Sequence, residues 1–201
     1  MKATFALLPP NDIHNLVRHL AWEAHTCQKI TTLAARLPAH VSLKISFDTR
    51  SLGQLETYMD ELAASTPPLE ISLTGLQLIK MGETGILWLD VVQTPELRRL
   101  HFRILEDLCA CMGESVRVSP DGEDYHFHMT VAMGKPLSAF QEAFAAMATC
   151  EVNTSFTARD LCLFLYDDQA GLDESYITYK ILPLMGQGQA ALPGVDPQTG
   201  I

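Results

Sequence analysis

Two short segments constrain this chain most, because each predicts a strand that carries a histidine and a hydroxyl on one face. The segment "HVSLKIS" places His40 two residues before Ser42, and the segment "HMTVAM" places His128 two residues before Thr130. In both segments the flanking apolar residues take the alternate positions. Side chains two residues apart in a strand point to the same face. Each predicted strand therefore presents a histidine and a hydroxyl opposite its apolar face.

The order of predicted elements repeats along the chain, which favours an internal duplication. Apolar runs and amphipathic segments alternate as strand–helix–strand–helix–strand over residues 2–81 and again over 85–184. The elements expected are strand 4–8, a helix capped by Asn11, strand 41–47, helix 52–64 and strand 69–81, then strand 86–92, a helix opened by Pro95, strand 127–133, a helix opened by Pro136, and strands 155–166 and 176–184.

Each motif strand is the third element of its repeat, so a pseudo-twofold axis would bring the two histidines and the two hydroxyls together. We expect an α+β fold of two pseudo-symmetric lobes, with antiparallel sheets lining a central groove and helices outside. Residues 1–185 are expected to form this single two-lobed domain. The Gly-, Pro- and Gln-rich segment 186–201 is expected to be a mobile tail.

Composition narrows the class of protein. A hydrophobic content of 47% with 19% charged residues indicates a globular chain, and a net charge of −10 argues against a general nucleic-acid binder. The five cysteines lack paired CxxC spacing and are expected to be reduced thiols. No apolar run is long enough to span a membrane. We therefore expect a cytoplasmic monomer.

The paired motifs suit phosphodiester chemistry. Imidazole titrates near neutral pH, so one histidine can take a proton from the attacking oxygen while the other gives a proton to the leaving oxygen. Hydroxyls can donate hydrogen bonds to nonbridging phosphate oxygens as negative charge develops on them. This chemistry requires neither a metal nor another cofactor.

The motifs His40-Val41-Ser42-Leu43 and His128-Met129-Thr130-Val131 resemble the two signature motifs of the 2H phosphoesterase superfamily. The branch they resemble is the 2′-5′ RNA ligase-like proteins, also called RNA 2′,3′-cyclic phosphodiesterases. The resemblance extends from about residue 2 to residue 184 in element order. It also implies the two-lobed α+β architecture.

The resemblance implies roles for individual residues. His40 and His128 would be the acid/base pair, with Ser42 and Thr130 as the phosphate-binding hydroxyls. Lys44 stands where many members have a basic residue, and alternation predicts that its side chain faces the groove. The implied reaction is hydrolysis of the 2′,3′-cyclic phosphate of a nucleotide or RNA end to a 2′-phosphomonoester. Since no cluster of further basic residues is evident, a long RNA tract is not expected as a partner.

Other interpretations remain open. The same fold could act on ADP-ribose 1″,2″-cyclic phosphate, on 2′-5′ linkages or on a cyclic oligonucleotide, or it could bind nucleotides without turnover. His126 is expected to contact substrate or solvent. Together with His128 it could also ligate a metal, because residues two apart on a strand can share one ion. In that hydrolase the ligand set would be completed by one of Asp121, Glu123, Asp124 and His40.

Overall fold

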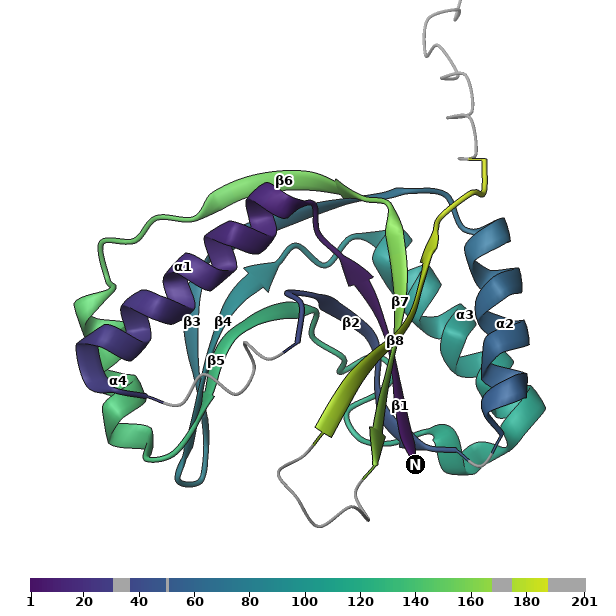
Figure 1. Ribbon diagram of the computed structural model, residues 1–201, viewed down its shortest axis with the longest axis horizontal. Coiled ribbons are helices and arrows are strands. Elements are labelled where there is room, and N and C mark those ends of the chain that lie inside the picture. Colours follow the sequence, from purple (N-terminus) through teal and green to yellow (C-terminus); the bar gives the residue numbers. More distant parts are fainter. Residues whose placement is uncertain (31–36, 50, 168–174, 188–201) are drawn as a thin grey trace, which may run out of the picture.

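A computed structural model of the chain describes residues 1–30, 37–49, 51–167 and 175–187 and shows one curved sheet of eight strands (Figure 1). The strand order is β6-β3-β4-β5-β2-β1-β7-β8, and all neighbours pair antiparallel. The strands are β1 (Lys2–Leu8), β2 (Val41–Asp48), β3 (Leu69–Met81), β4 (Thr84–Val91), β5 (His128–Gly134), β6 (Asn153–Ala158), β7 (Asp160–Asp167) and β8 (Ser175–Pro183). The helices are α1 (Asn11–Gln28), α2 (Leu52–Ser65), α3 (Pro95–Met112) and α4 (Leu137–Ala146). The α+β class and the antiparallel sheet expected from the sequence are confirmed.

The sheet divides into two halves that meet at its centre. We call them the β5 half (β6, β3, β4 and β5) and the β2 half (β2, β1, β7 and β8). Helices α1 and α4 pack against the β5 half, and α2 and α3 pack against the β2 half (Figure 1). One continuous apolar core lies between the helices and the sheet. The face of the sheet opposite this core is left for the polar side chains of the motif strands.

The two predicted repeats do not fold as separate lobes. Helix α1 follows β1 in sequence, yet it packs against α4 and β5 in the other half. Helix α3 follows β4, yet it packs against β2. Each half therefore combines elements from both repeats, and neither repeat can bury its apolar surface alone. The duplication itself stays a prediction from the sequence pattern.

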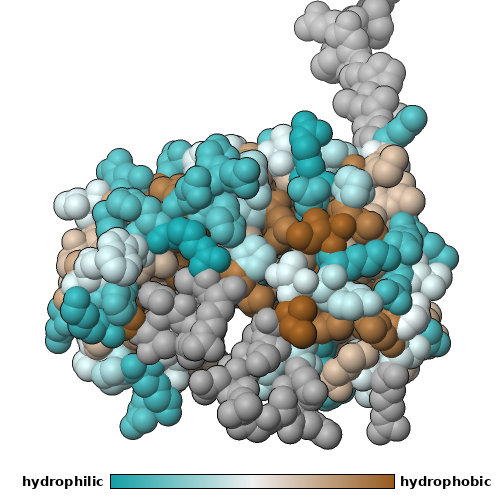
Figure 2. Space-filling model, in the orientation of Figure 1, coloured by the Kyte–Doolittle hydropathy of each residue, from teal (hydrophilic) through white to brown (hydrophobic). Residues whose placement is uncertain are grey.

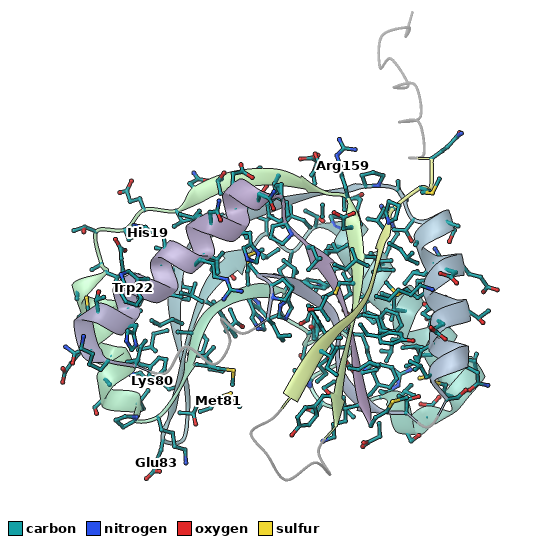
Figure 3. The ribbon with its side chains drawn as sticks, in the orientation of Figure 1. His19, Trp22, Lys80, Met81, Glu83 and Arg159 are labelled. Atoms are coloured by element: carbon teal, nitrogen blue, oxygen red, sulfur yellow. The ribbon has the colours of Figure 1, made fainter. Side chains whose placement is uncertain are left out.

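One predicted strand is wrong in extent. The segment 155–166 was expected to form one strand, but the structure divides it into β6, paired with β3, and β7, paired with β1. The two strands lie near opposite edges of the sheet, and Arg159 is on the connection between them (Figure 3). Alternation reports which face a residue occupies, not which strand it pairs with.

The ends of the elements follow local signals with small differences. The Thr94 side chain accepts a hydrogen bond from the Leu97 amide and caps α3, with Pro95 in its first turn. The expectation that Asn11 caps α1 is wrong, because Pro10 holds that place and makes no side-chain cap.

Segment 188–201 of the predicted tail lies outside the described residues. No helix among the residues that the structure describes is long and apolar enough to cross a membrane.

Glycine at position 85 is required by close packing between β4 and α4. A Cβ atom placed there would lie 2.4 Å from Cβ of Phe140, which is fully buried. We expect Gly85→Ala to lower the free energy of unfolding by about 2 kcal/mol, since α4 must shift to relieve the overlap. Urea unfolding measures this change. The matched control is Gly53→Ala in α2, where nothing lies within 4 Å and stability should be unchanged or slightly higher; equal effects at both sites would contradict the packing argument.

Candidate functional site

The sheet face opposite the helices carries both motifs, and we call it the motif face. Val41 and Leu43 of β2 are fully buried in the core beneath the sheet, so the alternating residues His40 and Ser42 point to the other side. Strand β5 repeats this arrangement with His128 and Thr130. All four motif side chains are partly exposed. The structure therefore brings together the four residues that the sequence singled out.

The register between the two motif strands sets how these residues face each other. Val41 pairs with Met129 across the centre of the sheet, in antiparallel sense. Extending this register by one residue places His40 opposite Thr130. Extending it by one residue in the other direction places His128 opposite Ser42. Each histidine thus lies across from the hydroxyl of the other motif.

Backbone carbonyls fix the tautomer of both histidines. Nδ1 of His40 lies 2.8 Å from the carbonyl oxygen of Pro38, and Nδ1 of His128 lies 2.8 Å from that of His126. A carbonyl oxygen only accepts hydrogen bonds, so in each ring Nδ1 must carry a proton and donate it. Nε2 is then the nitrogen left for chemistry. In the neutral ring it is a proton acceptor, and in the cation it is a proton donor.

Aromatic rings hold the planes of the two imidazoles. The Trp88 ring stacks on His128 with centroids 4.0 Å apart and an interplanar angle of 23°. The Phe164 ring lies 4.8 Å from that of His40, tilted by 58°. A packed neighbour restricts rotation about the last side-chain bond, which otherwise has a broad range. Each Nε2 is therefore held in a narrow range of directions.

Burial keeps both histidines ready to act as bases near neutral pH. It lowers the pKa of His40, and a positive charge on His128 lowers that pKa further, against the opposing effect of the hydrogen bond to Pro38. Burial also lowers the pKa of His128, partly opposed by its backbone bond and by the Asp90 carboxylate. Repulsion between the two imidazoles disfavours the state in which both rings are protonated. Paired acid/base catalysis needs one neutral ring and one protonated ring.

The motif hydroxyls are available to a ligand. In the described part of the chain, neither the Ser42 nor the Thr130 hydroxyl makes a side-chain hydrogen bond with the protein. Each hydroxyl can therefore donate its proton outward. Two donors and two imidazole nitrogens on one face are suited to binding a tetrahedral anion.

Lys44 does not face the motif face, so that expectation is wrong. Two consecutive residues of β1 pair with Ser42 and Lys44, which leaves Leu43 as an extra residue in β2. Such a bulge turns the following side chain to the other side of the strand. The Lys44 side chain is fully buried beneath the sheet, where Nζ lies 2.7 Å from Oδ2 of Asp121.

The second motif strand has the same irregularity at the same place. Consecutive residues of β4 pair with Thr130 and Ala132, so Val131 is the extra residue. Ala132 is fully buried and Met133 is 42% exposed, the reverse of what strict alternation predicts. In both strands the bulge directly follows the motif hydroxyl. No signal in the sequence marks either bulge.

His126 lies beside the site and is already paired. Its Nε2 is 2.5 Å from Oδ1 of Asp90, a residue that pairs across the β4–β5 ladder with His128. Asp90 and Phe164 were not identified from the sequence, because isolated acidic and aromatic residues in strands carry no such signal. Trp88 was a possible base-stacking residue, but aromatic residues in strands more often belong to the core.

For the candidate metal site at His126 and His128, the structure places Asp121 out of reach. Asp121 is engaged with Lys44 on the opposite side of the sheet. Among the residues that the structure describes, no group of three His, Cys, Asp or Glu side chains is arranged to hold a metal ion.

A cavity elsewhere on the described part of the chain does not include the motif residues. It has a volume of about 570 Å³ and lies between α2 and α3. Its lining includes Tyr58, Glu61, Arg103 and Asp107. His19 is exposed on α1 near Trp22 (Figure 3). Hydrophilic residues cover much of that side of the molecule, whereas hydrophobic ones gather over β7 and β8 (Figure 2).

Comparisons with known proteins identify the family of the chain. The sequence model of the 2′-5′ RNA ligase superfamily matches residues 9–170. No curated protein matches the chain in sequence.

Solved structures share the fold at low sequence identity. TT0787 of Thermus thermophilus has a TM-score of 0.66 and 13% identity, covering 94% of this chain and 100% of that one. LigT of E. coli, in a complex with 3′-AMP, has a TM-score of 0.61 and 17% identity, covering 91% and 97%. Usb1 of Kluyveromyces marxianus has a TM-score of 0.50 and 15% identity, covering 91% and 98%.

Acidification should destabilise the fold through the site histidines. The folded state holds the pKa of His40 and of His128 below the ordinary value, so the unfolded chain binds more protons as the pH falls. The free energy of unfolding should therefore decrease from about pH 7 to about pH 5. In His40→Asn, which keeps a donor for the Pro38 carbonyl, this decrease should be smaller. Urea unfolding at several pH values measures it, and an equal or steeper decrease in the variant would contradict the assigned burial.

Proposed function

Because the chain belongs to the 2′-5′ RNA ligase superfamily, we propose that it is a metal-independent cyclic phosphodiesterase. Its substrate is the 2′,3′-cyclic phosphate of a nucleotide or RNA end, and its product is a 2′-phosphomonoester. One observation carries the proposal. Both motif histidines donate Nδ1–H to a backbone carbonyl 2.8 Å away, which leaves both Nε2 atoms for the substrate on a face that also carries two hydroxyls.

The reaction follows from these groups. Water attacks phosphorus, and the neutral Nε2 of one histidine takes its proton. The bond from phosphorus to the 3′-oxygen breaks, and the protonated Nε2 of the other histidine gives its proton to that oxygen. The Ser42 and Thr130 hydroxyls donate hydrogen bonds to the nonbridging oxygens, where negative charge increases in the transition state. At the end of the reaction the histidine that was neutral carries the proton and the other histidine has lost its proton. Exchange of protons with solvent restores the starting protonation state of the two rings.

The surroundings of the site support a substrate of nucleotide size. Next to His40, the motif face of the β2 half carries a small apolar cluster of Ala6, Cys162 and Phe164, with Leu8 and Leu37 packed against it. Ala6, Cys162 and Phe164 are buried, so only Leu8 and Leu37 of this cluster are open to a ring or a sugar face of the substrate. Lys44 is committed to Asp121 and cannot add a phosphate contact. The LigT structures named with 3′-AMP and with NADP+ show nucleotides in complex with that protein.

Replacing either histidine should abolish most of the activity. We expect His40→Ala and His128→Ala each to lower kcat on nucleoside 2′,3′-cyclic phosphates by roughly 10²–10⁴-fold, the usual contribution of an acid or base residue. The assay follows the phosphomonoester product by ³¹P NMR in excess EDTA, with His19→Ala as the matched control because that side chain is 66% exposed on α1.

The alternatives predict different results in this assay. A native rate that is abolished by EDTA and restored by zinc would replace the proposal with metal-dependent chemistry. Binding of the cyclic nucleotides without turnover, unaffected by loss of one histidine, would indicate a binding module. Turnover confined to ADP-ribose 1″,2″-cyclic phosphate, 2′-5′ linkages or a cyclic oligonucleotide would move the substrate within the same fold.

The hydroxyls should contribute mainly to the transition state. We expect Ser42→Ala and Thr130→Ala each to lower kcat by about 10²-fold with a smaller change in KM, because the donated bonds strengthen as charge develops on the phosphate. Steady-state kinetics with one cyclic nucleotide measures both constants, and Ser65→Ala in α2 is the control. A variant that raises KM and leaves kcat unchanged would show that the hydroxyl serves ground-state binding only.

A further inference from the structure

The two motif strands are held together by very little of the sheet itself. Within the described residues, β2 and β5 share the single ladder pair of Val41 and Met129, whereas β1 and β7 share seven pairs. Two strands joined at one point can pivot and separate, yet acid/base catalysis needs both motifs at a fixed distance from one phosphorus atom. Other contacts must therefore set the spacing of the motifs.

A buried tyrosine provides the first of these contacts. The Tyr125 hydroxyl donates a hydrogen bond to the backbone carbonyl of Ser42, with oxygens 3.0 Å apart, and the side chain is 2% exposed. Tyr125 lies three residues before His128 in the chain. This bond therefore ties the backbone of one motif to the segment that leads into the other.

A buried histidine provides the second contact. Nδ1 of His101 lies 2.7 Å from the carbonyl oxygen of Leu43, and its Nε2 accepts the Gly122 amide at 2.9 Å. Both ring nitrogens are used in a way that only the neutral ring allows, and burial lowers the pKa of His101 accordingly. The ring also stacks on Tyr125 with centroids 4.4 Å apart. His101 thus bridges the bulge of β2 and the loop before β5.

A buried ion pair provides the third contact. Nζ of Lys44 lies 2.7 Å from Oδ2 of Asp121, and both side chains are fully buried. Lys44 also donates to the carbonyl of Ile45, and Asp121 accepts the Val118 amide. Burying two charges costs free energy that their attraction only partly returns, so such a pair is poor evidence for stability alone. A role in fixing one geometry is the use for which buried pairs are best attested.

We propose that Lys44, His101, Asp121 and Tyr125 form a clamp that sets the distance between the two motifs. The clamp joins three consecutive residues of β2, beginning at Ser42, to the loop 119–125 that leads directly into the second motif. Its members lie beneath the sheet and do not reach the motif face, so they are positioning residues. The matching bulge in β5 has the apolar Ala132 where β2 has Lys44. The polar clamp therefore acts from the β2 side alone.

The closing experiment removes one oxygen from the clamp and follows the two imidazoles directly. Tyr125→Phe deletes only the bond to Ser42, and Tyr58→Phe is its matched control, since the Tyr58 hydroxyl donates to Asp107 between α2 and α3. NMR titration of the histidine Cε1–H signals needs no substrate. In Tyr125→Phe the pKa of His40 should rise, because separation of the strands weakens its repulsion by His128 and admits water. In Tyr58→Phe it should stay as in the native protein.

The clamp is overturned if the His40 titration is unchanged in Tyr125→Phe or shifts equally in Tyr58→Phe. A second variant tests the ion pair. Lys44→Met combined with Asp121→Leu removes both charges, leaves none unpaired in the core, and should move the His40 titration in the same direction. Unaltered titration in a folded double variant would remove these two residues from the clamp.

A rate measurement adds a readout that a general loss of stability would not give. This arm rests on the proposed hydrolysis. Tyr125→Phe should lower kcat by about tenfold with little change in KM, and by a similar factor when Ser42 is already alanine, since that substitution keeps the backbone carbonyl that accepts the bond. A kcat that is unchanged in both backgrounds would count against the clamp. If no cyclic phosphate is hydrolysed while the titrations shift as expected, the clamp stands and the proposed function fails.

Discussion

The pairing of Val41 with Met129 is the point on which this structure depends, because it is where the two halves of the sheet meet. The apolar side chains at that pair are buried in the core, which forces the flanking histidines and hydroxyls to the opposite face. A site made in this way needs two strands from distant parts of the chain. Helices α1 and α3 each pack on the half that does not contain the strand before them, which keeps those strands together, since neither repeat buries its apolar surface alone.

The electrostatics of the site suit a protein that carries a net charge of −10. The structure presents neutral donors and titratable rings on the motif face, while Lys44 is paired with Asp121 beneath it. Recognition of one phosphate can then depend on directed hydrogen bonds rather than on accumulated positive charge. The same arrangement disfavours a polyanion, which would meet the acidic surface without compensating contacts.

Much of the fold could be predicted from periodicity, and the errors have physical causes. The strand 69–81 and the helix opened by Pro95 are as expected, since alternation and an N-terminal cap are local signals. Lys44 was misplaced because a bulge shifts the side-chain period by one residue and leaves no mark in the sequence. Arg159 was placed within a strand, whereas it lies on the connection between β6 and β7, which have different partners.

By itself the sequence determined the four motif residues, their shared face on each strand and the acid/base chemistry that they allow, because these follow from residue type and a period of two. Only the tertiary structure decided that both imidazoles donate Nδ1–H to carbonyls, that Trp88 and Phe164 stack against them, and that Lys44 and His101 lie buried behind β2. The two Nδ1 bonds reach carbonyls only two residues earlier, but the other features depend on contacts between residues distant in sequence. Local patterns carry no information about such contacts, whose geometry is set when the core is packed.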